Sequence, residues 1–162
     1  INEFKIFCNK YPDQKLLIIG NGELKKKINS LIKKLDLTRN IFVIHYTENV
    51  YYYMKKSKAF ILSSLWEEVG FVIVEAAMSN TAVISSDCNN GPKEFLSFGN
   101  AGFLFRSNRQ KALYNSLELF VNSKEKEILK KKINAKINCL KFTMYRHQIE
   151  LSKILGQHAI KI

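Results

Sequence analysis

Short apolar runs alternate along the chain with stretches whose apolar positions follow helical spacing. Five runs are continuous and rich in Ile, Leu, Val or Phe, which is typical of strands buried in a parallel sheet. These runs cover residues 15–20, 40–46, 58–64, 81–86 and 101–105. Between the first two runs, Ile28, Leu31, Ile32 and Leu35 fall on one face of a predicted helix.

Helices are predicted between the strands and after the last strand. The helical segments before residue 108 cover residues 1–11, 23–35, 47–56 and 70–79, with a further helix opening at Pro92. Strands that alternate with helices over short connections predict an α/β fold, a doubly wound parallel sheet with helices on both faces. We expect a single domain over residues 1–162, with a sheet core at about 14–107 and closing helices at about 108–156.

The composition is that of a globular protein, with 46% hydrophobic and 25% charged residues. Its apolar runs are shorter than the ~18 residues that a membrane-spanning helix needs. The first residues lack the features of a signal peptide, and the chain does not begin with Met, so we expect a piece of a longer protein. Three widely separated cysteines are typical of buried thiols in a reducing cytosol.

The net charge of +12 comes largely from lysines, which cluster at residues 25–34 and 124–136. Both clusters follow helical spacing, so they are either solvated helix faces or surfaces that attract an anionic partner such as phospholipid head groups. Nucleic acid is the less favoured partner, because the few Arg residues are scattered and do not alternate with aromatic residues.

Ligands of such sheets bind at the carboxyl ends of the strands, so the loops there are the candidate site. After the first strand, GNGELKK lacks the third glycine of a dinucleotide-binding motif, which would stand at Lys25. Gly22 is then either a plain turn residue or a place where a ligand approaches the backbone. His45 and Tyr46 follow the second strand, and His45 has either a structural role or a place near a bound base.

The loop after the third strand carries the strongest signal, WEEVGFVIVEAA at residues 66–77. Gly70 opens a helix whose first N–H groups and partial positive charge suit a phosphate or a sugar hydroxyl. Glu75 stands inside an apolar run, where we expect it to be buried. A buried carboxylate needs partners, and two adjacent hydroxyls of a ligand would satisfy both of its oxygens.

This segment resembles the retaining glycosyltransferases of family four, which have the GT-B fold. The resemblance lies in Glu67 and Glu75, separated by seven residues, and in the order of the pieces around them. Those pieces are LLIIGNGELKKKI, LSSLWEE, GFVIVEAAMSN, AVISSD, NGPKEFL and AGFLF, over roughly residues 14–107. Phe142–Thr143 is similar to the pair that precedes the family's last helix. The glycine at position 70 is shifted from the family's pattern, and a second glycine is missing.

By this resemblance, Glu75 would hold the ribose hydroxyls of a nucleotide sugar, and Glu67 would contact the transferred sugar and stabilise the reacting centre. The backbone N–H groups of Gly70, Phe71 and Val72 would meet the donor. The Gly22 loop and the His45–Tyr46 loop would frame its phosphate and base.

The resemblance also implies the reaction, which is transfer of a sugar to a glycan or lipid-linked acceptor with retention. The expected setting is bacterial surface-polysaccharide synthesis (capsule or lipopolysaccharide) in the cytoplasm, with a peripheral contact at the inner face of the membrane. No metal is expected, because the sequence has no Asp-x-Asp.

An N-terminal acceptor-binding half, and an Arg and a Lys that clamp the diphosphate, would precede residue 1, so we expect this chain alone to be inactive. Two alternatives remain open: a non-catalytic nucleotide-binding module, and a nucleotide-sugar epimerase on the same fold.

Overall fold

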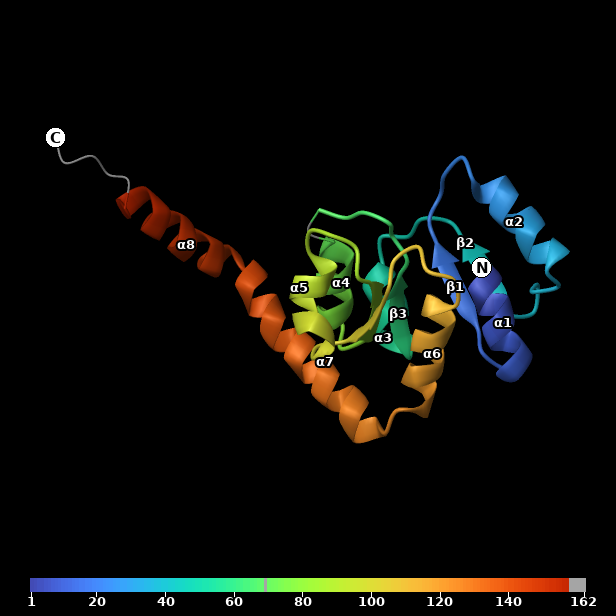
Figure 1. The fold of residues 1–162 in the computed structure, drawn as a ribbon. Coiled ribbons are helices and arrows are strands. Elements are labelled where there is room, and N and C mark those ends of the chain that lie inside the picture. The colour runs from blue at the N-terminus through green and yellow to red at the C-terminus, as the bar shows by residue number, and fades with distance from the viewer. Residues whose placement is uncertain (69, 158–162) are drawn as a thin grey trace.

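The computed structural model describes residues 1–68 and 70–157, and its elements alternate as the sequence predicts (Figure 1). The strands are β1 (Leu16–Ile19), β2 (Ile41–Ile44), β3 (Ala59–Leu62), β4 (Ala82–Ser86) and β5 (Phe103–Phe105). The helices are α1 (Asn2–Lys10), α2 (Lys25–Lys34), α3 (Val50–Lys56), α4 (Phe71–Met78), α5 (Pro92–Phe95), α6 (Ala112–Asn122), α7 (Glu125–Cys139) and α8 (Met144–Gln157), with 3-10 turns η1 (Ser97–Gly99) and η2 (Leu140–Phe142). Each predicted strand is present, and each is shorter than the apolar run that predicted it.

All strand pairs are parallel, which confirms the predicted α/β class. β1 pairs with β2, with Leu16 opposite Ile41, and β3, β4 and β5 form a second sheet in that order. Within the described residues, no backbone pairing joins β1 to β3. The two sheets nevertheless share one hydrophobic cluster, which includes Phe4, Phe7, Ile41, Ile84 and Phe103.

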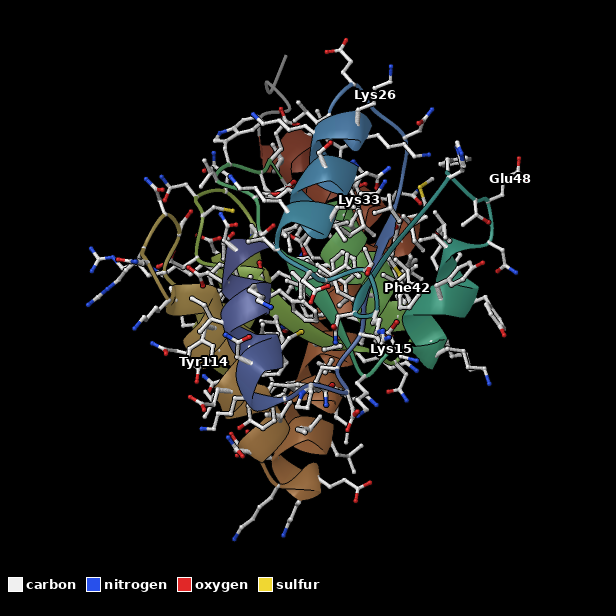
Figure 2. The ribbon with its side chains drawn as sticks, turned by 90° about the vertical axis from the view of Figure 1, so that its right-hand side faces the viewer. Lys15, Lys26, Lys33, Phe42, Glu48 and Tyr114 are labelled. Carbon is white, nitrogen blue, oxygen red and sulfur yellow. The ribbon has the colours of Figure 1, made fainter. Side chains whose placement is uncertain are left out.

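Helices α1 and α6 pack together over this cluster. The Tyr114 N–H of α6 donates to Glu3 Oε2 of α1 at 2.9 Å, and Lys10 forms an ion pair with Glu118. Figure 2 shows Tyr114 beside α1, where that contact forms. The hydrogen bond from Lys10 lowers the pKa of Glu118, so this contact between the helices is favoured in the ionised state.

A second cluster lies between the three-stranded sheet and α4, α5 and α7. Ile73, Ala76 and Ala77 of α4 pack there with Val83 of β4 and with Cys139 of α7. β4 is buried along its whole length, because strands flank it on both sides and helices cover both faces. The rigid end of this strand positions the loops described below.

The thiols of Cys8, Cys88 and Cys139 are free and buried, as the sequence predicts, and burial raises the pKa of Cys8 and Cys139. Of the helices in the described part of the chain, none combines the length and the apolar character needed to cross a bilayer. α8 continues from η2 and projects away from the body of the molecule (Figure 1).

Candidate functional site

The loops that follow β1, β3 and β4 leave the strands on the same side of the molecule, the upper side in Figure 1. The loops after β4 and β5 are tied together, because the Ser107 N–H donates to Asp87 Oδ1 at 2.6 Å. The carboxyl ends of parallel strands are where ligands bind in this class of fold, so the candidate residues occupy the expected edge.

Glu67 is held in place by a short chain of hydrogen bonds that begins in the core. The hydroxyl of buried Ser86, at the end of β4, donates to the Ser64 carbonyl at 2.6 Å. The Ser64 hydroxyl in turn donates to Glu67 Oε1 at 2.6 Å. The Glu67 side chain is half-buried, so one carboxylate oxygen is fixed while the side chain still reaches the surface.

Gly70 lies between Glu67 and the start of α5. It is buried and adopts the left-handed conformation with φ 66° and ψ 51°, which favours glycine. A Cβ at this position would lie 3.7 Å from Pro92 Cγ and 3.9 Å from Glu67 Cγ. Gly70 therefore sets the direction in which α4 leaves the Glu67 loop.

The first turn of α4 presents backbone donors beside Glu67. The Ile73 N–H donates to the Gly70 carbonyl at 2.9 Å. For the N–H groups of Phe71 and Val72, no described residue serves as the acceptor, as is usual for the first turn of a helix. A carboxylate and two helix N–H groups thus lie at one end of the loop, an arrangement that can bind the hydroxyls and the anionic oxygens of a ligand.

Glu75 is not buried, which corrects the prediction from the sequence. Its side chain is half-buried, and none of the described residues donates a hydrogen bond to its carboxylate. The apolar run suggested full burial, yet α4 buries one face only, and Phe71 and Met78 are 60% and 58% exposed. Glu75 lies on the side of α4 opposite the buried Ile73, so its charge stays in contact with water.

Gly22, His45 and Tyr46 form a second group, beside the first sheet. The Gly20 N–H donates to the Ile44 carbonyl at 3.2 Å and joins the two loops. Gly22 and His45 are exposed, and Tyr46 is 73% exposed. Hydrogen bonds connect residues within each group, and among the described residues none connects this group to Glu67 or Gly70.

Lys25 belongs to this second group, although the sequence pointed to it only as part of a lysine cluster and as the position of a missing glycine. Its ammonium lies 3.0 Å from His45 Nε2 and 3.3 Å from His45 Nδ1, at the first residue of α2. A cation beside helix N–H groups and an imidazole makes this loop pair suited to an anion. The sequence shows a basic residue next to the glycine loop, but its contact with His45 depends on the fold.

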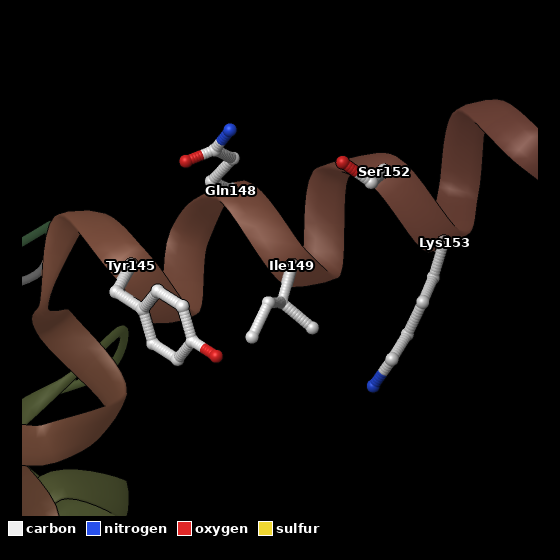
Figure 3. A pocket seen from close by; sticks show the side chains of 5 residues that line it. All are labelled: Tyr145, Gln148, Ile149, Ser152 and Lys153. Carbon is white, nitrogen blue, oxygen red and sulfur yellow. The ribbon is translucent and has the colours of Figure 1, made fainter.

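Two hollows in the described surface do not include Glu67 or Glu75. The larger, of about 490 Å³, is lined by α8 alone through Tyr145, Gln148, Ile149, Ser152 and Lys153 (Figure 3). One helix face cannot enclose a small molecule, so we assign it no ligand. The second, of about 410 Å³, lies where β3 and β5 end, and its lining includes Ser63, Arg106 and Arg109.

The model of the family described as glycosyl transferases group 1 matches residues 1–150 of the chain. The chain belongs to this family. An uncharacterized glycosyltransferase of Methanocaldococcus jannaschii is 44% identical over 96 residues, which are 59% of this chain and 24% of that protein. A 4-alpha-N-acetylgalactosaminyltransferase of Campylobacter jejuni, whose name gives a diphospho-undecaprenol acceptor, is 27% identical over 114 residues, 70% of this chain and 31% of that protein.

Among solved structures, an S. aureus TarM variant in complex with Fondaparinux, alpha-GlcNAc-glycerol and UDP superposes with a TM-score of 0.85. It is 23% identical, over 98% of this chain and 32% of that one, so the likeness shows the fold. The fold is that of the Rossmann-like, C-terminal-type half of a GT-B glycosyltransferase. The chain spans about a quarter to a third of the length of these three proteins.

Proposed function

We propose that this member of the glycosyl transferases group 1 is the donor-binding half of an enzyme that transfers a sugar from a nucleoside diphosphate with retention. The observation that carries the proposal is the carboxylate of Glu67, fixed by Ser64 beside the open first turn of α4. A fixed anion and free N–H donors at one point suit a reaction in which both positive and negative charge develop.

In this proposal, the bond between the sugar C1 and the diphosphate oxygen breaks, and the acceptor oxygen bonds to C1 on the same face. The acceptor's proton leaves with the nucleoside diphosphate. Glu67 contacts the sugar and stabilises the positive charge that develops at its ring. The N–H groups of Phe71 and Val72, beside Gly70, donate to the donor as negative charge grows on the leaving diphosphate.

Glu75 binds the two ribose hydroxyls in the same proposal. Its half-buried position favours this role, because a carboxylate that still contacts water can exchange that water for the ribose hydroxyls. Gly22, His45 and Tyr46 frame the phosphate and the base, and Lys25 adds a positive charge to that frame. The transfer uses no metal ion.

The acceptor is proposed to be a glycan or a lipid-linked sugar of bacterial surface polysaccharide, such as capsule or lipopolysaccharide, made in the cytoplasm. The name of the C. jejuni relative supports a lipid-linked acceptor, and the UDP in the TarM complex supports a nucleotide donor. A peripheral contact with an anionic membrane belongs to this proposal. The chain alone is proposed to bind nucleotide weakly and to need an N-terminal half for transfer.

The proposal is tested by calorimetric titration of the chain with UDP, GDP and ADP. We expect one of them to bind, and Glu75→Ala to weaken that binding by about 1–3 kcal/mol through loss of charged hydrogen bonds. Glu68→Ala is the matched control, because Glu68 is an exposed acid of the same segment and should leave the affinity unchanged. Equal losses in both variants would contradict the role of Glu75.

Ser64→Ala should lower the transfer rate about tenfold without changing nucleotide affinity, because it removes a hydrogen bond to a carboxylate, worth about 1.5 kcal/mol, that orients Glu67. Ser64→Thr, which keeps the hydroxyl, should restore the rate. Ser63→Ala, an exposed neighbour, is the control. A rate loss that follows a lower melting temperature, and is not restored by Thr, would show a purely structural role for Ser64.

A further inference from the structure

The inner face of α7 is fixed to the body of the protein by packing and by polar contacts. Ala135 and Cys139 are buried in the cluster beneath α4. Asn134 donates to the Asn100 carbonyl at 2.9 Å, and Asn138 donates to the Phe95 carbonyl at 2.6 Å. Lys131 donates to the Gly99 carbonyl. These contacts define which face of α7 is left for solvent.

The opposite face of α7, continued by the first residue of η2, carries an apolar stripe, defined as Leu129, Ile133, Ile137 and Leu140. Their spacing of four, four and three residues keeps them on one side of the helix. They are 50%, 51%, 57% and 59% exposed, so half or more of each side chain is in contact with water. A stripe of this kind on an otherwise packed helix indicates an interaction surface.

Lysines flank the stripe on both sides. The four lysines are exposed, and each lies one or three residues along the chain from a residue of the stripe. They are Lys126, Lys130, Lys136 and Lys141. The acids of α7, Glu125 and Glu127, stand in its first turn, and residues 128–141 contain no Asp or Glu. From residue 128 onward the outer face therefore combines an apolar centre with a cationic margin, and Glu125 lies at its first turn.

The second lysine-rich helix, α2, differs in this respect. Four of its lysines, Lys26, Lys27, Lys33 and Lys34, are exposed, and Lys25 is half-buried; Figure 2 labels Lys26 and Lys33. Apart from Leu24 at the N-cap, the large apolar residues of α2 are half-buried or buried. α2 is therefore positively charged, as a surface that attracts anions is, but it lacks an exposed apolar stripe. Comparing α2 with α7 separates the effect of charge from the effect of the stripe.

We propose that the outer face of α7 binds the surface of an anionic phospholipid bilayer, with the helix lying in the plane of the interface. The stripe would enter the boundary between head groups and acyl chains, and the flanking lysines would meet the lipid phosphates. Fifteen residues make a helix about 22 Å long, enough to rest on several head groups. The proposal names the surface that makes the membrane contact of the proposed function. Only the biological purpose of that contact depends on the proposed function.

The test is flotation of the chain with vesicles of phosphatidylcholine alone and of phosphatidylcholine containing about one-third phosphatidylglycerol. We expect flotation with the anionic vesicles only. Ile133→Gln with Ile137→Gln should lower the bound fraction about tenfold while keeping every lysine, and glutamine preserves the helix. Lys130→Gln with Lys136→Gln should lower binding about fivefold per lysine.

The matched control is Lys26→Gln with Lys33→Gln on α2, which removes the same charge from the other lysine-rich helix and should change binding less than twofold. An equal loss in the α2 variant, or no flotation of the unaltered chain, would overturn the proposal. A dimer that the Ile133/Ile137 variant converts to monomer would assign the stripe to a second copy instead. Nucleotide titration of the same variants separates the two proposals, since a failed donor site leaves flotation intact.

Discussion

Glu67→Gln is expected to lower the rate of sugar transfer about 10²–10³-fold in the protein that carries both halves of the enzyme. The substitution keeps the size of the side chain and the oxygen that accepts the Ser64 hydrogen bond at 2.6 Å. What it removes is the negative charge, which in our proposal stabilises the positive charge at the sugar ring. Donor binding in the ground state should change much less than the rate.

Glu68→Gln is the matched control for this experiment, because Glu68 is the adjacent acid and is exposed. Initial rates with saturating donor and acceptor, measured beside calorimetric donor affinity, separate the effect on chemistry from the effect on binding. A loss smaller than tenfold for Glu67→Gln, or equal losses for the two acids, would remove Glu67 from the proposed reaction.

Gly102→Ala is expected to lower the free energy of unfolding by about 2–3 kcal/mol, the largest effect on stability that we anticipate. A Cβ on Gly102 would lie 2.8 Å from the Val83 carbonyl oxygen and 2.8 Å from Leu96 Cδ2. Val83 belongs to β4, the strand that is buried along its whole length, so its backbone cannot shift without disturbing both neighbouring strands.

Urea denaturation followed by circular dichroism measures this loss, and the melting temperature should fall by about 5–10 °C. Gly22→Ala is the control for stability, because nothing lies within 4 Å of a Cβ placed there. It should stay within about 0.5 kcal/mol of the unaltered chain. Equal stabilities for the two variants would show that the sheet adjusts around Gly102 more freely than its packing indicates.

The order of strands and helices was predictable because each strand is a short apolar run followed by a polar loop. The ends of the strands were not, because an apolar run continues into residues that pack without pairing, such as Ala101 and Gly102 before β5. The division of the backbone pairing into two sheets was not predicted either, since partners of parallel strands depend on contacts far apart in sequence.

For single residues of the candidate site, too, the sequence predicted local features better than contacts and burial. The position of Gly70 before a helix was readable from the sequence, and its left-handed conformation supports that interpretation. The burial of Glu75 was misread, because α4 is apolar on both faces while only one face meets the core. The contacts of Ser86 with Ser64 and of Lys25 with His45 join different strands or loops, so no local pattern could reveal them.

In our proposal, a nucleotide binds at the edge formed by Gly70, α4 and the His45 loop. Nuclear magnetic resonance of the ¹⁵N-labelled chain during titration with the nucleotide chosen by calorimetry tests it most directly. We expect the largest amide shifts at Phe71, Val72 and Glu75, with smaller shifts at His45 and none on α6. Shifts confined to α8 or to the opposite ends of the strands would contradict it.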